Sequence, residues 1–142
     1  MSLKLAVGVT EKKIRMGDMH QNAEHTRHMI AEIHQAFKPQ LIVMDGVEIF
    51  VDGGPMSGKK VTAGIIVAGT DRIAIDAVGL AVLKNHGSNQ AIMSKKIFEQ
   101  EQIARAGELG LGASSPSEIE LVTGDGRSEE LREKIAGILS RG

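Results

Sequence analysis

The sequence predicts a single layered α/β domain, with a mostly parallel central sheet flanked by helices. Apolar runs of strand length alternate with segments of helix length along the chain. The runs at 41–44 and 64–69 are continuously apolar, which is typical of strands covered on both faces. The length of 142 residues, with 42% hydrophobic and 25% charged residues, fits one compact domain over residues 1–142.

The elements of the first half are expected in a regular order. Residues 3–10 form either a strand or a fragment of a longer element. Residues 22–38 carry an apolar stripe at helical spacing, and Pro39 ends this helix before the strand at 41–44. The next strand is expected at 64–69, because its β-branched residues are bounded by glycine.

The second half is predicted to continue the alternation. Residues 72–85 are apolar on nearly every side, which indicates a buried helix. A more polar helix is expected at 94–109, followed by a third strand at 119–124 with the sequence IELVTG. Ser128 begins a charged helix through Leu139, with acidic residues in its favourable first turn.

Composition excludes several classes of function. The formal net charge of -1 and the low aromatic content of 2% provide neither the basic surface nor the stacking platform that nucleic-acid binding needs. The lack of cysteine excludes a disulfide or a cysteine-ligated iron–sulfur cluster within this chain. No segment has the apolar length of a membrane span or signal sequence, so we expect a soluble, cytoplasmic protein without membrane contact.

Aspartates are the candidate catalytic residues. Asp45 and Asp71 each follow a predicted strand, at the sheet edge where open α/β domains bind ligands. They are also the candidate metal ligands for Mg²⁺ or Mn²⁺, because hard cations prefer anionic oxygens. Asp76 interrupts the apolar helix, and a buried carboxylate needs a partner or a metal. Alternatively, Asp45 is a turn residue, Asp71 a helix N-cap and Asp76 the i,i+4 partner of Arg72.

The glycine-rich loop GGPMSGK is the candidate anion- or ligand-binding segment. Its residues Gly53, Gly54, Gly58 and Lys59 match part of a phosphate-binding loop, where backbone donors and a lysine contact phosphate. The nucleotide-binding form is rejected, because Lys60 replaces the Ser or Thr that binds magnesium and a strand follows instead of a helix. A plain glycine loop between strands is the alternative. If the loop does bind a ligand, we expect it to form one cleft together with the strand-end residues Asp45 and Asp71.

In chain order, the segments SLKLAVGV, LIVMDGVE, GGPMSG and GTDRIAIDAVG resemble a prokaryotic family called domain of unknown function 362. The most specific of them is T-D-x-x-A-x-D-A-V at 70–78. Members of this family are often described as iron–sulfur or ferredoxin-associated proteins, but this chain has no cysteine for a cluster. The family domain is usually longer, so the resemblance implies that this chain corresponds to its C-terminal half.

Two functions are consistent with these residues. The first is a domain of uncharacterised activity that binds a ligand or a divalent metal ion. A redox-associated role is one of the options for this function. The second is a non-catalytic interaction module that docks on a missing N-terminal half, on a partner subunit or on another copy as a homo-oligomer. Carboxylates that converge to about 4–6 Å in an open cleft favour the first function, and scattered, exposed carboxylates favour the second.

Overall fold

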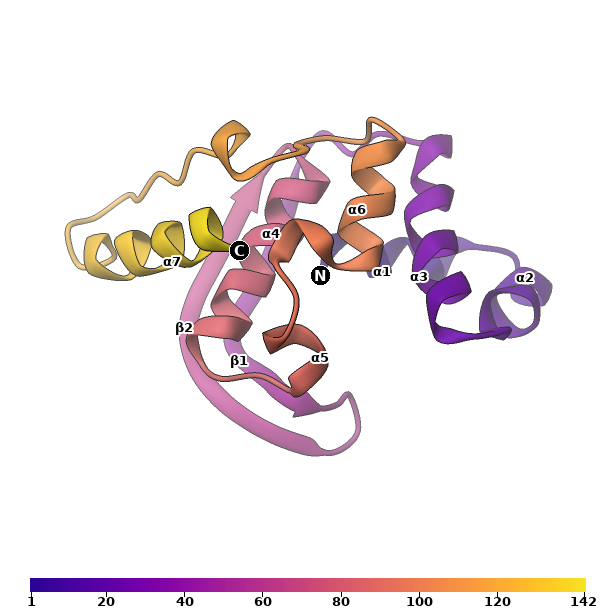
Figure 1. The fold of residues 1–142 in the computed structure, drawn as a ribbon, viewed down its shortest axis with the longest axis horizontal. Coiled ribbons are helices and arrows are strands. Elements are labelled where there is room, and N and C mark those ends of the chain that lie inside the picture. Colours follow the sequence, from indigo (N-terminus) through magenta and orange to yellow (C-terminus); the bar gives the residue numbers. More distant parts are fainter.

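A long β-hairpin packed against helices dominates the computed structural model, which describes all 142 residues (Figure 1). The strands β1 (Ile42–Gly53) and β2 (Gly58–Gly69) are antiparallel and form a two-stranded sheet. The register pairs the first residue of β1 with the last residue of β2, so the hairpin turn lies at the far end. The mixed helix and strand content expected of the chain is confirmed.

The prediction of a mostly parallel central sheet is wrong. Only residues 54–57 connect β1 to β2, whereas parallel strands require a crossover of about a dozen residues or more. The residues between the two apolar runs do not form a crossover helix but lengthen both strands up to the turn. Exposure alternates along β2, so the apolar runs reflect one face packed on helices and a second apolar face left exposed.

The other two expected strands are absent. Residues 119–124 make no strand pairing, although half-buried and exposed residues alternate along this extended segment. Residues 3–9 belong to α1 (Ser2–Leu5) and to a 3-10 turn at Ala6–Val9, so the strand alternative for residues 3–10 is wrong.

Helices precede and follow the hairpin. Before it come α1, α2 (Lys12–Met16) and α3 (Ala23–Glu32), with 3-10 turns at Asp18–His20 and Ile33–Ala36. After it come α4 (Arg72–Asn85), α5 (Gln90–Met93), α6 (Glu101–Glu108) and α7 (Glu129–Arg141), with 3-10 turns at Ile97–Glu99 and Pro116–Glu118.

The predicted helices at 72–85 and 128–139 are confirmed as α4 and α7. The helix predicted at 22–38 consists of α3 and the 3-10 turn after it. The helix predicted at 94–109 is interrupted, because Lys96 and Gln100 have extended backbone conformations on either side of a 3-10 turn.

α4 forms the centre of the core. Ten of its fourteen residues are buried, and its neighbours include the hairpin, α1, α6 and α7 (Figure 1). Two of the buried residues are charged, namely Arg72 and Asp76. None of the helices has both the length and the apolar character needed to cross a membrane.

Candidate functional site

Asp71 joins the start of α4 to a distant loop. As the N-cap it accepts hydrogen bonds through Oδ1 from the backbone N–H groups of Ile73 (2.8 Å) and Ala74 (2.9 Å). Its Oδ2 accepts a third bond from the N–H of Ala113 at 2.7 Å. A Cβ at Gly112 would lie 2.3 Å from Oδ1, so the loop approaches the carboxylate this closely only with glycine there. The expected N-cap role is confirmed.

Asp76 is fully buried and caps the first helix of the chain. Its carboxylate accepts hydrogen bonds from the backbone N–H groups of Ser2 and Leu3, and Gln102 Nε2 lies 3.4 Å from Oδ2. Burial raises the pKa of Asp76 above its ordinary value, while the chain's N-terminal ammonium and the bonds from Ser2 and Leu3 oppose this rise. The expected surface pair with Arg72 is not formed, because these α1 donors occupy the carboxylate.

Arg72 and His34 form a second buried cluster beside Asp76, which sequence reasoning missed. The Arg72 guanidinium donates to the carbonyl oxygens of His34 (2.7 Å) and Phe37 (2.8 Å). The imidazole links to Arg72 through Nδ1 at 3.1 Å and to the carbonyl of Leu3 through Nε2 at 2.9 Å. These contacts assign the neutral tautomer, in which Nε2 carries the hydrogen. No sequence spacing pointed to this cluster, because residues 34 and 72 belong to separate helical segments.

The pKa of His34 is lowered from its ordinary value of 6.5, first by burial and then by the nearby Arg72 charge. The hydrogen bond to Leu3 and the Asp76 charge act in the opposite direction. His34 is 3% exposed, and its ring contacts donors and acceptors of the chain itself. The cluster therefore fixes α1 and the residues before β1 against α4.

Asp45 lies on the outer face of the hairpin. It is exposed, pairs in register with Ile66 and accepts a hydrogen bond from the Val47 N–H at 2.9 Å. Asp71 lies beyond the last residue of β2, next to α4. The structure therefore does not bring these two carboxylates together on one side of the sheet. No group of three or more His, Asp or Glu side chains is arranged to hold a metal ion.

The glycine-rich loop forms the hairpin turn, at the opposite end of the strands from Asp71. Gly53 and Gly54 have φ angles of 71° and 83°, which glycine adopts readily. The turn leads into β2, so no helix N-terminus faces it, as expected from the rejected nucleotide-binding motif. Lys59 is exposed opposite Asp52 in the register. The loop and Asp71 do not bound a common cleft, and anion binding by the loop stays a prediction.

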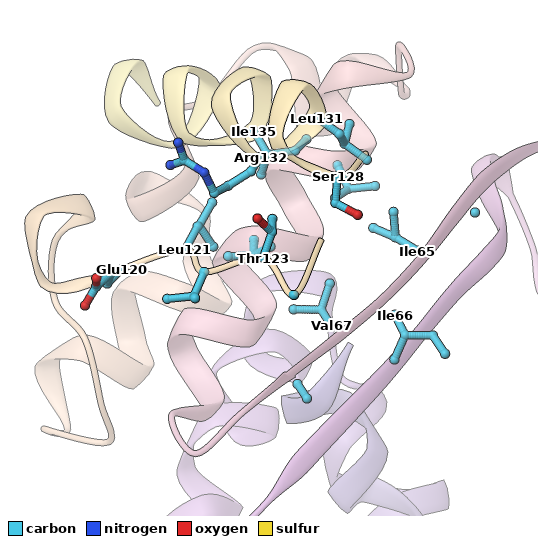
Figure 2. A pocket seen from close by; sticks show the side chains of 16 residues that line it. Ile65, Ile66, Val67, Glu120, Leu121, Thr123, Ser128, Leu131, Arg132 and Ile135 are labelled. Carbon is cyan, nitrogen blue, oxygen red and sulfur yellow. The ribbon is translucent and has the colours of Figure 1, made fainter. Parts of the chain in front are cut away.

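Two of the hollows near β2 are relevant to function. One is polar, with a volume of about 850 Å³, and is lined by residues 34–40, 70–72 and 110–112, including Asp71. The other is an apolar groove of about 440 Å³ between β2, residues 120–124 and α7 (Figure 2). In Figure 2, Ile65 and Ile66 project from opposite sides of β2 beside this groove.

Comparison with curated proteins and with solved structures finds no match. The model of one family, described as Domain of unknown function (DUF362), matches residues 1–81. This match spans more than half of the chain, from α1 through the hairpin into α4. It includes the three candidate aspartates and the hairpin turn. The chain therefore belongs to the DUF362 family.

Proposed function

We propose that this chain is a non-catalytic interaction module that binds another polypeptide through its β-hairpin. The observation that carries the proposal is the apolar outer face of the hairpin. There the exposed fractions of Leu41, Val43 and Ile66 are 66%, 62% and 70%. Val43 and Ile66 are neighbours of Asp45 along and across the strands, so they belong to one surface. A contiguous exposed apolar surface is characteristic of interaction sites.

The backbone of the hairpin supports the same function. Each strand has only the other as its strand neighbour, so no further strand pairs with the second edge of either one. Unpaired strand edges offer N–H and C=O groups that readily pair with a further polypeptide. The sheet is therefore open to a partner both at its outer face and at its edges.

The candidate carboxylates favour interaction over catalysis. Asp71 and Asp76 are occupied by backbone N–H donors, and Asp45 lies apart from them on the outer face. The three carboxylates are scattered, as the second function requires, but only Asp45 is also exposed, because Asp71 is half-buried and Asp76 is buried. Their roles in the fold are to cap helices and to close a local turn.

The test is selection of binders by the full chain from a displayed library of random peptides about seven residues long, close to the usual strand length. The proposal predicts that peptides bind the Val43→Lys or the Ile66→Lys variant of the chain more weakly than the parent chain. They should bind the Glu24→Lys variant as tightly as the parent. Glu24 is an exposed residue of α3 and serves as the matched control. Failure to select a binder, or binders insensitive to both hairpin variants, would contradict the proposal.

A second candidate function is binding of a small ligand or a divalent cation in the polar hollow beside Asp71. The observation in its favour is that the Asp71 carboxylate lines this hollow together with polar residues of 34–40. Titration calorimetry with Mg²⁺ and Mn²⁺ tests it on the parent chain, Asp71→Asn and Asp45→Asn. If both variants lose affinity, the result supports a metal ion held by Asp45 and Asp71 together. If only Asp71→Asn loses affinity, the result supports binding in the hollow. No binding by the parent chain would contradict both.

A further inference from the structure

We propose that the partner supplies one extended strand, which inserts between β2 and residues 120–124. The inserted strand would convert the hairpin into a four-stranded sheet, with residues 120–124 as the outermost strand. This inference rests on the proposed function and specifies the partner's chemistry. The position is the apolar groove of about 440 Å³ shown in Figure 2.

One wall of the groove is the free edge of β2. Residues 64–68 line it, and β1 pairs only with the opposite edge. In a strand, successive residues direct their backbone N–H and C=O groups to alternate sides. Alternate residues of 64–68 therefore present unpaired donors and acceptors to the groove.

The opposite wall is the extended segment at 120–124. Its backbone makes no hydrogen bond to any other residue of the chain. Exposure nevertheless alternates from residue 119 to residue 123, as in a strand with one face on a core. The Thr123 hydroxyl donates to Glu129 Oε2 at 2.9 Å, which ties this segment to α7. Two extended backbones with unpaired groups thus border the same groove.

Apolar side chains form the floor and part of the rim, and the lining also includes Glu120, Thr123, Ser128 and Arg132 (Figure 2). The floor is contributed by α4 (Val78 and Val82) and by α7 (Leu131 and Ile135). At the rim, Ile66 is 70% exposed and Val122 is 80% exposed, one on each wall. An inserted strand would place every second side chain on the floor, so these positions must be apolar. Its outward side chains would lie between Ile66 and Val122, where β-branched residues pack well.

The pattern of free edges identifies the occupant as a single strand. A strand in the groove must pair on both edges, with β2 on one side and residues 120–124 on the other. The hairpin of a second copy cannot do so, because each of its strands already has one edge paired. An apolar small molecule would leave the backbone groups of both walls without partners.

The test uses a peptide selected by the full chain from the displayed library. Hydrogen exchange with this peptide bound is expected to slow at alternate amides of 64–68 and of 120–124 together. Methylating the peptide amides that face one wall should weaken binding by about tenfold or more, since each methylated amide loses one backbone hydrogen bond. Val122→Lys should weaken binding similarly, and Glu24→Lys on α3, which does not line the groove, should leave it unchanged.

The outcomes separate the two proposals. If a peptide binds and slows amide exchange only at the outer face, with unchanged exchange at 120–124, strand insertion is wrong. The proposal of an interaction module is then still supported. The absence of any binding peptide would overturn both. Peptides that bind in the groove without an alternating apolar pattern, or that tolerate amide methylation, would also contradict strand insertion.

Discussion

Replacing Asp71 by alanine measures how far this carboxylate serves the fold instead of a ligand. The change removes three hydrogen bonds, from Ile73 (2.8 Å), Ala74 (2.9 Å) and Ala113 (2.7 Å). Loss of an N-cap costs about 1 kcal/mol. The Ala113 N–H, on a residue that is 5% exposed, is left without a partner, at a cost of about 1–3 kcal/mol. The free energy of unfolding should therefore fall by about 2–4 kcal/mol.

Urea unfolding followed by circular dichroism is the assay. With a slope of about 2 kcal/mol per molar urea, the midpoint should drop by roughly 1–2 M. Asp71→Asn should fall between the parent and Asp71→Ala, because its carbonyl oxygen still caps α4 while its amide nitrogen cannot accept from Ala113. Asp45→Ala is the matched control, and an exposed change of this kind should cost about 0.5 kcal/mol or less. Equal midpoints for Asp71→Ala and Asp45→Ala would refute the capping role.

Three further predictions follow from the buried clusters and the turn. Asp76→Ala should lower the free energy of unfolding by about 2–4 kcal/mol, measured in urea, because the N–H groups of Ser2 and Leu3 lose their acceptor. Because the folded-state pKa of His34 is lowered, stability should be complete above pH 6.5 and decline as the pH falls below it, and His34→Gln should flatten this slope. Gly58→Ala should destabilise the hairpin by about 2 kcal/mol or more in the same assay, because its Cβ would lie 2.2 Å from the Asp52 carbonyl; an unchanged midpoint would refute this.

The pattern of apolar residues identified the main helices but not the topology of the sheet. The buried helix α4 and the final helix α7 were predictable because their spacing and their start signals agree. The direction of β2 was predicted wrongly, although the sequence between the two apolar runs contains no segment that reads as a crossover helix. Apolar residues on the outer face, such as Val43 and Ile66, imitate a strand covered on both faces.

The candidate site was predictable only in part. Asp71 as an N-cap and Asp76 as a buried residue follow from the local sequence. The partners of Asp76 are backbone groups of Ser2 and Leu3, more than 70 residues away in the chain. Such long-range contacts with backbone groups carry no residue-type signal, so a sequence pattern cannot reveal them. The buried contact between His34 and Arg72 joins two side chains that are 38 residues apart in the chain, and no local spacing pattern links such positions.

Residue-resolved hydrogen exchange of the unbound chain tests the central claim, that the hairpin is open to a partner strand. The structure predicts that alternate amides of 64–68 exchange slowly and the others rapidly, because β2 is paired on one edge only. All backbone amides of 120–124 should exchange rapidly, because none of them has a hydrogen-bond acceptor in the chain. Slow exchange at every amide of both segments would show that the two backbones are already paired, and would contradict the account.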